Sequence, residues 1–315
     1  MINVLYSFDD KYAPYAGISI LSLLANHISD EAITVFCGGM DISEDNIDKI
    51  NKTVRQYGQT ITWLDAKEAI HIIETSKTAS WNGSKAIWLK VLLPWVLPSD
   101  VDKILYIDSD TLVLGDVSEA YNYDMNGHLG MVLESVAPYL AEPLGLDRYF
   151  NSGVLLMDVN YWKDEAFKKT FLEHLDKNAE KYTAPEQCLL NDFFREKICE
   201  LPMRFNMQAF HMLYSSSAYF SAFKGYHYYS EDEVNSAKEN PLIIHFFRIF
   251  GDYPWVKGNI HPVNGEFHKW KNISLWKDYD DLNTEFNFVF FVEKILYRIL
   301  PEKIFIKLFR LIAER

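Results

Sequence analysis

The chain has 315 residues, of which 49% are hydrophobic and 15% are aromatic. A chain of this size and composition can bury a substantial core, which argues against a mainly disordered protein. Its formal net charge of −13 argues against a nucleic-acid-binding protein, because phosphates are neutralised by a basic face. An odd and small number of cysteines, three in all, predicts a reducing compartment. The sequence shows no basic leader of a signal peptide and no apolar run of the ~18–20 residues that a membrane span needs. We therefore expect a cytoplasmic protein.

The first part of the chain alternates strand and helix patterns. The predicted strands are residues 2–8, 32–37, 60–65 and 103–108, and the predicted helices are residues 15–27, 43–58 and 85–97. Such alternation predicts a parallel sheet with helices on both faces. In sheets of this kind, ligands bind beyond the carboxyl ends of the strands. Two acidic stretches, "SFDD" at 7–10 and "DSD" at 108–110, follow strands in this way.

The later part of the chain is less regular. Its predicted elements are strands at 130–135, 152–159 and 241–247 and a long amphipathic helix at 161–182. Residues 203–240 are rich in Tyr, Phe and Ser, and we predict an irregular, lid-like region there. No internal repeat or low-complexity linker is visible, so residues 1–280 are predicted to form one catalytic-type domain.

The C-terminal residues 281–315 are predicted to form a separate helical tail. Residues 286–315 carry six Lys/Arg and three Glu, a local net charge of +3, so the remainder carries −16. In a helix, apolar residues would cover most of the surface and four charged residues would share one face. The charged residues are Lys303, Lys307, Arg310 and Glu314. A basic amphipathic helix of this kind is typical of an anionic membrane surface. The alternative is a terminal helix that docks on its own domain.

Asp108 and Asp110 stand one residue apart at the end of a buried strand. On an extended backbone both side chains point to the same side. Two carboxylates this close repel each other, and a divalent cation removes that penalty. Oxygen ligands in small number suit Mg²⁺ or Mn²⁺, with substrate phosphates completing the shell. The alternative is a surface turn, but apolar runs on both sides disfavour it.

Six segments in order resemble the family 8 retaining glycosyltransferases, which include glycogenin and bacterial lipopolysaccharide galactosyl- and glucosyltransferases. They are "SFDDKYAPYAGISILSLLANH", "DKILYIDSDTLV", "FNSGVLLMDVNYW", "PEQCLLN", "RFN" and "IIHFF" followed by "PW", spread over residues 2–255. The resemblance implies a GT-A fold, a Rossmann-like sheet with a smaller acceptor-binding part. It also implies UDP-glucose or UDP-galactose as donor, Mn²⁺ as cofactor, and a glycan or glycolipid acceptor.

The resemblance also implies roles for individual residues. The metal ligands would be Asp108, Asp110 and His245, with Ser109 between the carboxylates, and the imidazole favours Mn²⁺ over Mg²⁺. The uracil would be held by Ser7, Asp9 and Tyr12; Asp9 could instead cap the following helix. Lys90 would meet the diphosphate and sugar. The residues lining the donor sugar would be Glu134, Asn151, Gly153, Glu186 and Gln187.

Two features depart from the family pattern. Glu134 and Glu186 stand where the family more often has Asp, which moves each carboxylate by about 1 Å or more and leaves the sugar specificity open. The phosphate loop usually reads His-x-x-Gly-x-x-Lys-Pro-Trp, whereas "HFFRIFGDYPW" is two residues longer and has Tyr253 in place of the lysine. Gly251 would still let the backbone approach the phosphate. The replacement cations to consider are Arg248 and Lys257.

The predicted function is Mn²⁺-dependent hexose transfer with retention, in lipopolysaccharide or surface polysaccharide synthesis. Gln187 is a poor nucleophile, which favours front-side attack by the acceptor, with Glu186 and Glu134 orienting groups or stabilising charge. The alternative is a nucleotide-sugar or carbohydrate-binding protein that has lost turnover. A nucleotidyltransferase is disfavoured because "SFDDKYAPY" lacks glycine. The acceptor loops are predicted at 79–86 and 203–240, and the tail predicts peripheral contact with the inner face of the cell membrane.

Overall fold

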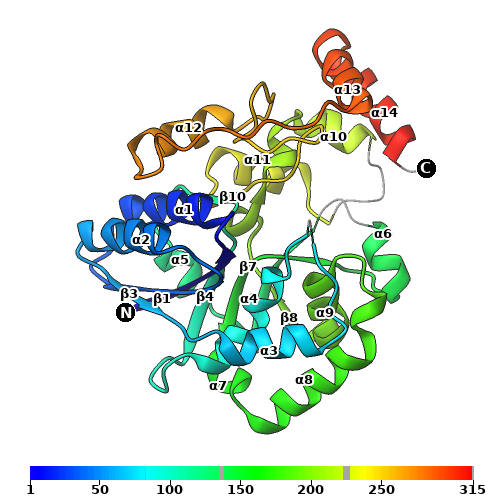
Figure 1. Cartoon of the computed structure of the whole chain (residues 1–315). Coiled ribbons are helices and arrows are strands. Elements are labelled where there is room, and N and C mark those ends of the chain that lie inside the picture. Colours follow the sequence, from blue (N-terminus) through cyan, green and yellow to red (C-terminus); the bar gives the residue numbers. More distant parts are fainter. Residues whose placement is uncertain (82, 135–137, 223–227, 314–315) are drawn as a thin grey trace.

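A seven-stranded sheet forms the centre of the molecule (Figure 1). We describe a computed structural model, which covers residues 1–81, 83–134, 138–222 and 228–313. The strands, in spatial order, are β3 (Thr60–Trp63), β2 (Ile33–Met40), β1 (Ile2–Asp9), β4 (Lys103–Ile107), β7 (Phe150–Asp158), β6 (Leu129–Leu133) and β8 (Ile198–Glu200). Only β7 runs antiparallel to its neighbours. The predicted mostly parallel α/β sheet is therefore confirmed.

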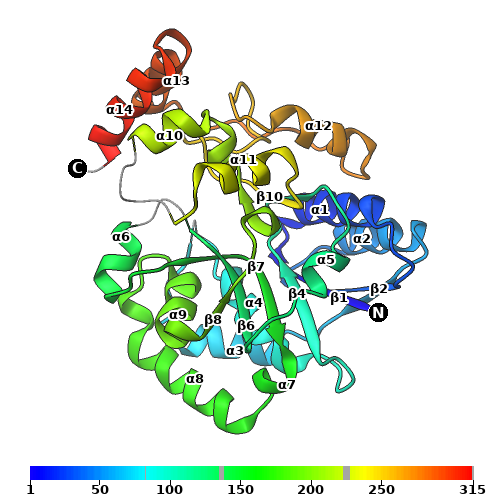
Figure 2. The same ribbon diagram turned by 180° about the vertical axis from the view of Figure 1, so that it is seen from behind.

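Helices cover both faces of this sheet, as the alternating pattern predicted. On one side lie α1 (Ala13–Asn26), α2 (Glu44–Gln56) and α5 (Ser118–Tyr121); on the other lie α3 (Lys67–Thr75), α4 (Leu89–Leu92), α7 (Val159–Trp162), α8 (Glu165–Asn178) and α9 (Pro185–Phe194) (Figures 1 and 2). The other helices that precede the C-terminal tail are α6 (Pro138–Ala141), α10 (Ser216–Ala222), α11 (Glu231–Glu239) and α12 (Asn264–Ile273). Aromatic side chains fill the interior, because each removes a large apolar area from water; Trp88, Trp162, Tyr106 and Phe171 are almost completely buried.

A second, three-stranded sheet joins the late part of the chain to the strand end at Asp110. Its strands are β5 (Thr111–Val113), β10 (Ile243–His245) and β9 (Met207–Gln208). β10 runs antiparallel to β5, with His245 opposite Thr111. The backbone N–H of Phe246 also donates to the carbonyl of Asp110 at 2.8 Å. The pairing therefore brings residue 245 beside residues 108–110.

Three predicted elements differ in the structure. The long helix at 161–182 is wrong: two helices, α7 and α8, replace it, because the Asp164 carboxylate accepts from the backbone N–H of Phe167 at 2.9 Å and starts a new helix. The region 203–240 is not wholly irregular, since it contains α10 and α11. A capping box of Ser230 and Glu233 begins α11. The late strand is limited to Ile243–His245, and Ser135 of the predicted strand 130–135 lies outside the described residues.

The C-terminal tail forms two helices, α13 (Phe288–Ile299) and α14 (Glu302–Ala313), beside α10 (Figures 1 and 2). One face of α14 docks on the rest of the chain, because Phe305 and Ile306 are buried against Leu213 and Tyr214. Lys303 and Lys307 are exposed as predicted, whereas Glu314 lies outside the described residues. Among the described helices, none has the length and apolarity that crossing a membrane requires.

Trp276 attaches the segment after α12 to the face of the sheet that carries α1 and α2. Its side chain is 2% exposed, and its indole N–H donates to Asn46 at 2.8 Å. The ring lies so close to α1 that a Cβ atom added to Gly17 would stand 2.1 Å from it. The absence of a side chain at residue 17 therefore creates the space for this tryptophan.

We expect Trp276→Ala to lower the free energy of unfolding by about 3–5 kcal/mol, because it leaves a large cavity and removes the donor to the Asn46 amide oxygen. Urea denaturation followed by circular dichroism measures the change. Ile273→Ala is the matched control, since Ile273 is 65% exposed, and it should change stability by less than about 0.5 kcal/mol. Equal effects of the two substitutions would show that Trp276 does not attach this segment.

Candidate functional site

A cavity of about 490 Å³ opens where β1 and β4 end, between the large sheet and β10. Most of the predicted site residues line it. They are Ser7, Asp9, Tyr12, Lys90, Asp108, Ser109, Asp110, Glu134, Asn151, Glu186, Gln187 and His245. Gly153 and Gly251 are not among the lining residues. The carboxyl-end rule thus located the cavity correctly from sequence.

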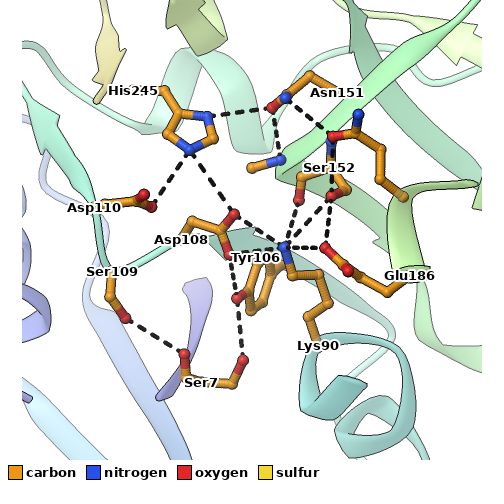
Figure 3. A network of polar contacts seen from close by, with 12 residues as sticks. Ser7, Lys90, Tyr106, Asp108, Ser109, Asp110, Asn151, Ser152, Glu186 and His245 are labelled. Carbon is orange, nitrogen blue, oxygen red and sulfur yellow. Dashed lines mark hydrogen bonds and ion pairs between the residues drawn. The ribbon is translucent and has the colours of Figure 1, made fainter. Parts of the chain in front are cut away.

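Asp108, Asp110 and His245 converge at one side of this cavity (Figure 3). Each offers one oxygen or nitrogen atom, and these atoms lie within 4.8 Å of one another. His245 Nε2 is 3.3 Å from an Asp110 oxygen and 4.0 Å from an Asp108 oxygen. Burial lowers the pKa of His245, but the two carboxylates more than offset this and leave it raised. The cluster therefore favours a positive charge between its members.

Lys90 neutralises the buried acids from the other side (Figure 3). Its Nζ lies 2.9 Å from Asp108 and 3.2 Å from Glu186, and the residue is 2% exposed. The Tyr106 hydroxyl donates to Asp108 at 2.6 Å. Burial raises the pKa of Asp108, Lys90 opposes this rise, and Asp110 adds to it, so that the pKa of Asp108 stays above its ordinary value. Lys90 thus belongs to the charge balance of the site and is not a solvated helix lysine.

The imidazole of His245 is fixed by side-chain amides on its Nδ1 side. Nδ1 lies 3.2 Å from Asn151 Oδ1 and 3.1 Å from Asn206 Oδ1. Asn206 also donates to Asn151 Oδ1 at 2.7 Å. A Cβ atom on Gly153 would stand 2.2 Å from the ring, so the glycine leaves the space that the ring occupies. Gly153 therefore acts sterically, which the sequence assignment to the donor sugar did not foresee.

A hydrogen-bonded group of acids and amides forms the inner end of the cavity. Glu134 accepts from Asn151 at 2.7 Å, and burial raises the pKa of Glu134. Gln187 Oε1 accepts from the backbone N–H of Ser152 and from Asn151 Nδ2, each at 3.0 Å. Glu186 meets Lys90 and the Ser152 hydroxyl. Because these contacts fix the side chains, this end presents a rigid polar surface.

The opposite end of the cavity is built by the β1–α1 turn. Asp9 accepts from the backbone N–H of Tyr12 at 3.1 Å and from the Ser84 hydroxyl at 2.7 Å. Tyr12 is the N-cap residue of α1, and no side chain caps this helix. Asp9 therefore orders the turn before α1 and links it to the 79–86 loop, and the alternative role of Asp9 as a helix cap is wrong. Burial and the nearby Asp110 raise the pKa of Tyr12 to about 12, so its phenol stays neutral. Ser7 Oγ lies 3.0 Å from the Tyr106 hydroxyl.

The lengthened loop after His245 places Arg248 and Tyr253 at the cavity, whereas Lys257 does not line it. The Arg248 guanidinium lies 5.4 Å from the centre of the Tyr253 ring. That ring stacks on Trp255 at 4.6 Å, and Trp255 stacks on Tyr15 at 3.8 Å. Among the described lining residues, Arg248 is the cation for which no carboxylate partner is found.

The donor set at Asp108, Asp110 and His245 fits a divalent cation. Two carboxylates and one imidazole suit Mn²⁺, and Mg²⁺ also accepts the oxygens. Asn151 and Asn206 hold the side of the imidazole that faces away from the acids, which is the support that metal-bound histidines usually have. Burial and the nearby Asp110 raise the pKa of Asp108, and the two carboxylates raise the pKa of His245 against the effect of burial.

Sequence reasoning did not assign roles to four residues that shape the site: Ser84, Tyr106, Ser152 and Asn206. Tyr106 could have been found, because it stands two residues before Asp108 and shares its side of the strand. Asn206 belongs to the quoted "RFN" segment. Ser152 belongs to the quoted "FNSG" segment and Ser84 to the predicted 79–86 loop, but their individual roles depend on contacts with segments that are distant in the chain.

Comparisons with known proteins show which family the chain resembles. The model of the family described as "Glycosyl transferase family 8" matches residues 3–257. General stress protein A of Bacillus subtilis is 25% identical over 285 residues, covering 88% of this chain and 95% of the relative. Lipopolysaccharide 1,2-glucosyltransferase of Escherichia coli K12 is 27% identical over 293 residues, covering 88% of this chain and 79% of the relative.

A solved structure has the same fold. The galactosyltransferase LgtC, in complex with donor and acceptor sugar analogues, superimposes with a TM-score of 0.70 at 20% identity. The match covers 87% of this chain and 96% of that one. The expected GT-A architecture is therefore confirmed as a fold.

We expect Lys90→Met to lower the free energy of unfolding by about 3–5 kcal/mol, because Asp108 and Glu186 are left without their buried cation. Added Mn²⁺ should restore part of this loss by supplying positive charge, which thermal unfolding with and without Mn²⁺ measures. Lys168→Met is the control: Lys168 pairs with the exposed Glu68 at 2.9 Å, and its loss should cost below about 1 kcal/mol. A Lys90 variant as stable as the control would refute this charge balance.

Proposed function

The chain belongs to glycosyl transferase family 8, and from this premise we propose that it is a retaining hexosyltransferase with a UDP-sugar donor. The proposed acceptor is a glycan or glycolipid of lipopolysaccharide or a related surface polysaccharide. One observation carries the proposal: Asp108, Asp110 and His245 converge in a cavity beyond the carboxyl ends of parallel strands, beside a second group of acids and amides. One end suits a diphosphate with its cation, and the other suits a sugar.

The proposed nucleotide position is the end of the cavity near Ser7, Asp9 and Tyr12. A uracil there would place its polar edge toward Ser7 and Asp9 and its face toward the Tyr12 ring. Ser84 already holds one Asp9 oxygen at 2.7 Å, which orients the carboxylate. The phenol of Tyr12 stays neutral because its pKa is raised to about 12, so it adds no negative charge near the donor.

For the diphosphate we propose a cation at Asp108, Asp110 and His245, with Mn²⁺ preferred, together with Arg248. A bound cation would neutralise the charge that develops on the departing UDP. Lys90 is already paired with Asp108 and Glu186. Its main role would therefore be to balance the charge of these two carboxylates, and not to bind the diphosphate. Arg248 lies at the cavity without a carboxylate partner among the described residues, and a guanidinium matches phosphate oxygens well. We therefore assign to Arg248 the role of the missing loop lysine.

The inner group of residues favours front-side attack over a covalent intermediate. Gln187 Oε1 accepts from Ser152 and Asn151, and an amide oxygen with two donors is a poor nucleophile. Glu186 is held by Lys90 at 3.2 Å, which positions one carboxylate to stabilise the positive charge that develops on the sugar. Glu134 is buried, with its pKa raised, so it is suited to orient a sugar hydroxyl. The acceptor hydroxyl would then attack from the side that UDP leaves.

The hexose that we propose for the donor is either glucose or galactose. One relative is named as a glucosyltransferase, and one similar structure is that of a galactosyltransferase. Glu134 and Glu186 are each one methylene longer than the aspartates that the family more often has, so the cavity around the sugar has its own shape. A single hydroxyl that is hydrogen-bonded by such a site can change specificity strongly.

Release of UDP from UDP-glucose and from UDP-galactose, measured with and without Mn²⁺, tests the proposal. We expect Mn²⁺-dependent release from at least one donor, increased by lipopolysaccharide-type acceptors. Asp110→Asn should lower the rate about 100-fold or more, because the cation loses a charged ligand worth several kcal/mol. Asp124→Asn, an exposed aspartate that does not line the cavity, should leave the rate unchanged.

The alternative function predicts a different result. A nucleotide-sugar-binding protein without turnover would be stabilised by UDP and Mn²⁺ but would release no UDP with any acceptor. That outcome would replace the transferase proposal by a binding function. Absence of both binding and release would contradict both.

We also propose that the tail docks on an anionic membrane surface. Its outward side carries exposed apolar side chains, which include Phe286 at 74%, Phe288 at 69% and Ile299 at 68%. Exposed cations accompany them, namely Arg298, Lys303 and Lys307. The tail has a net positive charge, whereas the rest of the chain is strongly negative. Anionic lipid would therefore attract the tail and repel the rest of the chain. A cytoplasmic chain held this way would lie at the inner face of the cell membrane.

Vesicle sedimentation tests the membrane contact without removing the docked helices. We expect the protein to bind vesicles that contain phosphatidylglycerol, and the double variant Phe288→Asp, Ile299→Asp to lose at least about tenfold in affinity, because buried apolar area is replaced by charge. Ile28→Asp is the matched control, since Ile28 is 85% exposed elsewhere. Equal binding of all three proteins would exclude the tail as the contact.

A further inference from the structure

Residues 249–252 form a tight hairpin whose two ends reach the cavity. The backbone N–H of Ile249 donates to Asp252 at 2.8 Å, and the N–H of Asp252 donates back at 3.1 Å. Phe250 and Gly251 both have positive φ, at 49° and 81°, which is the pattern of a type I′ turn. Arg248 precedes the hairpin and Tyr253 follows it, and both line the cavity. Phe250 and Gly251 thus form the tip of a projection, and neither of them lines the cavity.

Three consecutive residues of this projection contact the C-terminal helices. The Phe250 ring lies 5.4 Å from Tyr297 and 5.6 Å from Phe305, centre to centre. A Cβ atom on Gly251 would stand 2.3 Å from the Phe290 ring. Asp252, which is 3% exposed, forms an ion pair with Lys294. Gly251, which the sequence assigned to phosphate approach, therefore faces α13.

The hairpin depends on these contacts for its conformation. A phenylalanine with positive φ is strained and persists only where its surroundings hold it. The aromatic neighbours of Phe250 and the ion pair of Asp252 stabilise this conformation. Without the ion pair, Asp252 would be a buried and unpaired charge, which is destabilising. Because Arg248 and Tyr253 adjoin the hairpin directly, its position sets the position of the guanidinium at the cavity.

We propose that α13 is a positioning element for the donor: Phe290 and Lys294, acting through the 249–252 hairpin, hold Arg248 where the diphosphate binds. This inference rests on the proposed function. The tail then contributes to donor affinity through contacts within the chain, whether or not a membrane is present.

UDP titration in the presence of Mn²⁺ tests the inference on the full-length chain. We expect Phe290→Ala and Lys294→Met each to raise the Kd for UDP about tenfold, the loss expected when a charged hydrogen bond to phosphate is no longer held in place. Lys294→Arg should bind like wild type, because it keeps the ion pair with Asp252. The controls are Val289→Ala, a neighbour on α13 that is 55% exposed, and Lys269→Met, which loses a surface pair with Glu266; both should keep the wild-type Kd.

A double-mutant cycle separates positioning from general damage. If α13 acts through Arg248, Arg248→Met should raise the Kd for UDP, and adding Phe290→Ala to it should raise the Kd no further. A further tenfold rise in the double variant would overturn the inference, as would an unchanged Kd in the Phe290 and Lys294 variants.

Hydrogen exchange of the backbone amides of residues 246–256, without nucleotide, gives a readout that does not need the proposed function. We expect faster exchange in Phe290→Ala than in wild type and Val289→Ala. If wild type binds no UDP, the proposed donor site fails and the positioning role falls with it, although faster exchange would still show that α13 holds the hairpin. If UDP binds and exchange is unchanged in Phe290→Ala, the inference alone is overturned.

Discussion

The site depends on keeping three acids, Asp108, Asp110 and Glu186, in one largely buried region. Such a group is stable only when positive charge and hydrogen bonds balance it, because isolated carboxylates are costly to remove from water. Lys90 supplies one charge between Asp108 and Glu186, and His245 stands beside Asp110. Burial raises the pKa of Asp108, and the two neighbouring carboxylates raise the pKa of His245. A divalent cation with a diphosphate would complete this balance, which links the stability of the site to the ligand that we propose for it.

The two sheets together create this arrangement. The parallel strands β1 and β4 end side by side, and the short pairing of β5 with β10 returns the chain to the same edge. Gly153 leaves the space for the imidazole, and Asn151 and Asn206 fix its orientation. The lengthened loop after β10 then contacts the tail through Phe250 and Asp252. The proposed donor site and the C-terminal helices are therefore connected through one short segment, although the tail is far from Asp108 in the chain.

The sequence allowed much of the fold to be predicted, because strand and helix periodicities are local. Most strands and helices up to residue 107 and the position of the acids at strand ends followed from such patterns, although α3 and β5 were not predicted, and the ordered motifs indicated the family. The errors were also local in origin. Asp164 begins a new helix within an apparently continuous amphipathic pattern, and the capping box at Ser230 was overlooked in a region rich in aromatic residues.

By itself, the sequence determined the chemistry available to this protein: paired carboxylates after a buried strand, a late histidine, a lysine absent from the phosphate loop, and a basic tail on an acidic chain. Only the tertiary structure decided how these parts meet. It placed Lys90 between two acids, turned Gly153 and Gly251 into sites of close packing, and selected Arg248 over Lys257 at the cavity. The physical reason is that contacts between residues distant in the chain depend on packing geometry, which no local pattern of residues records.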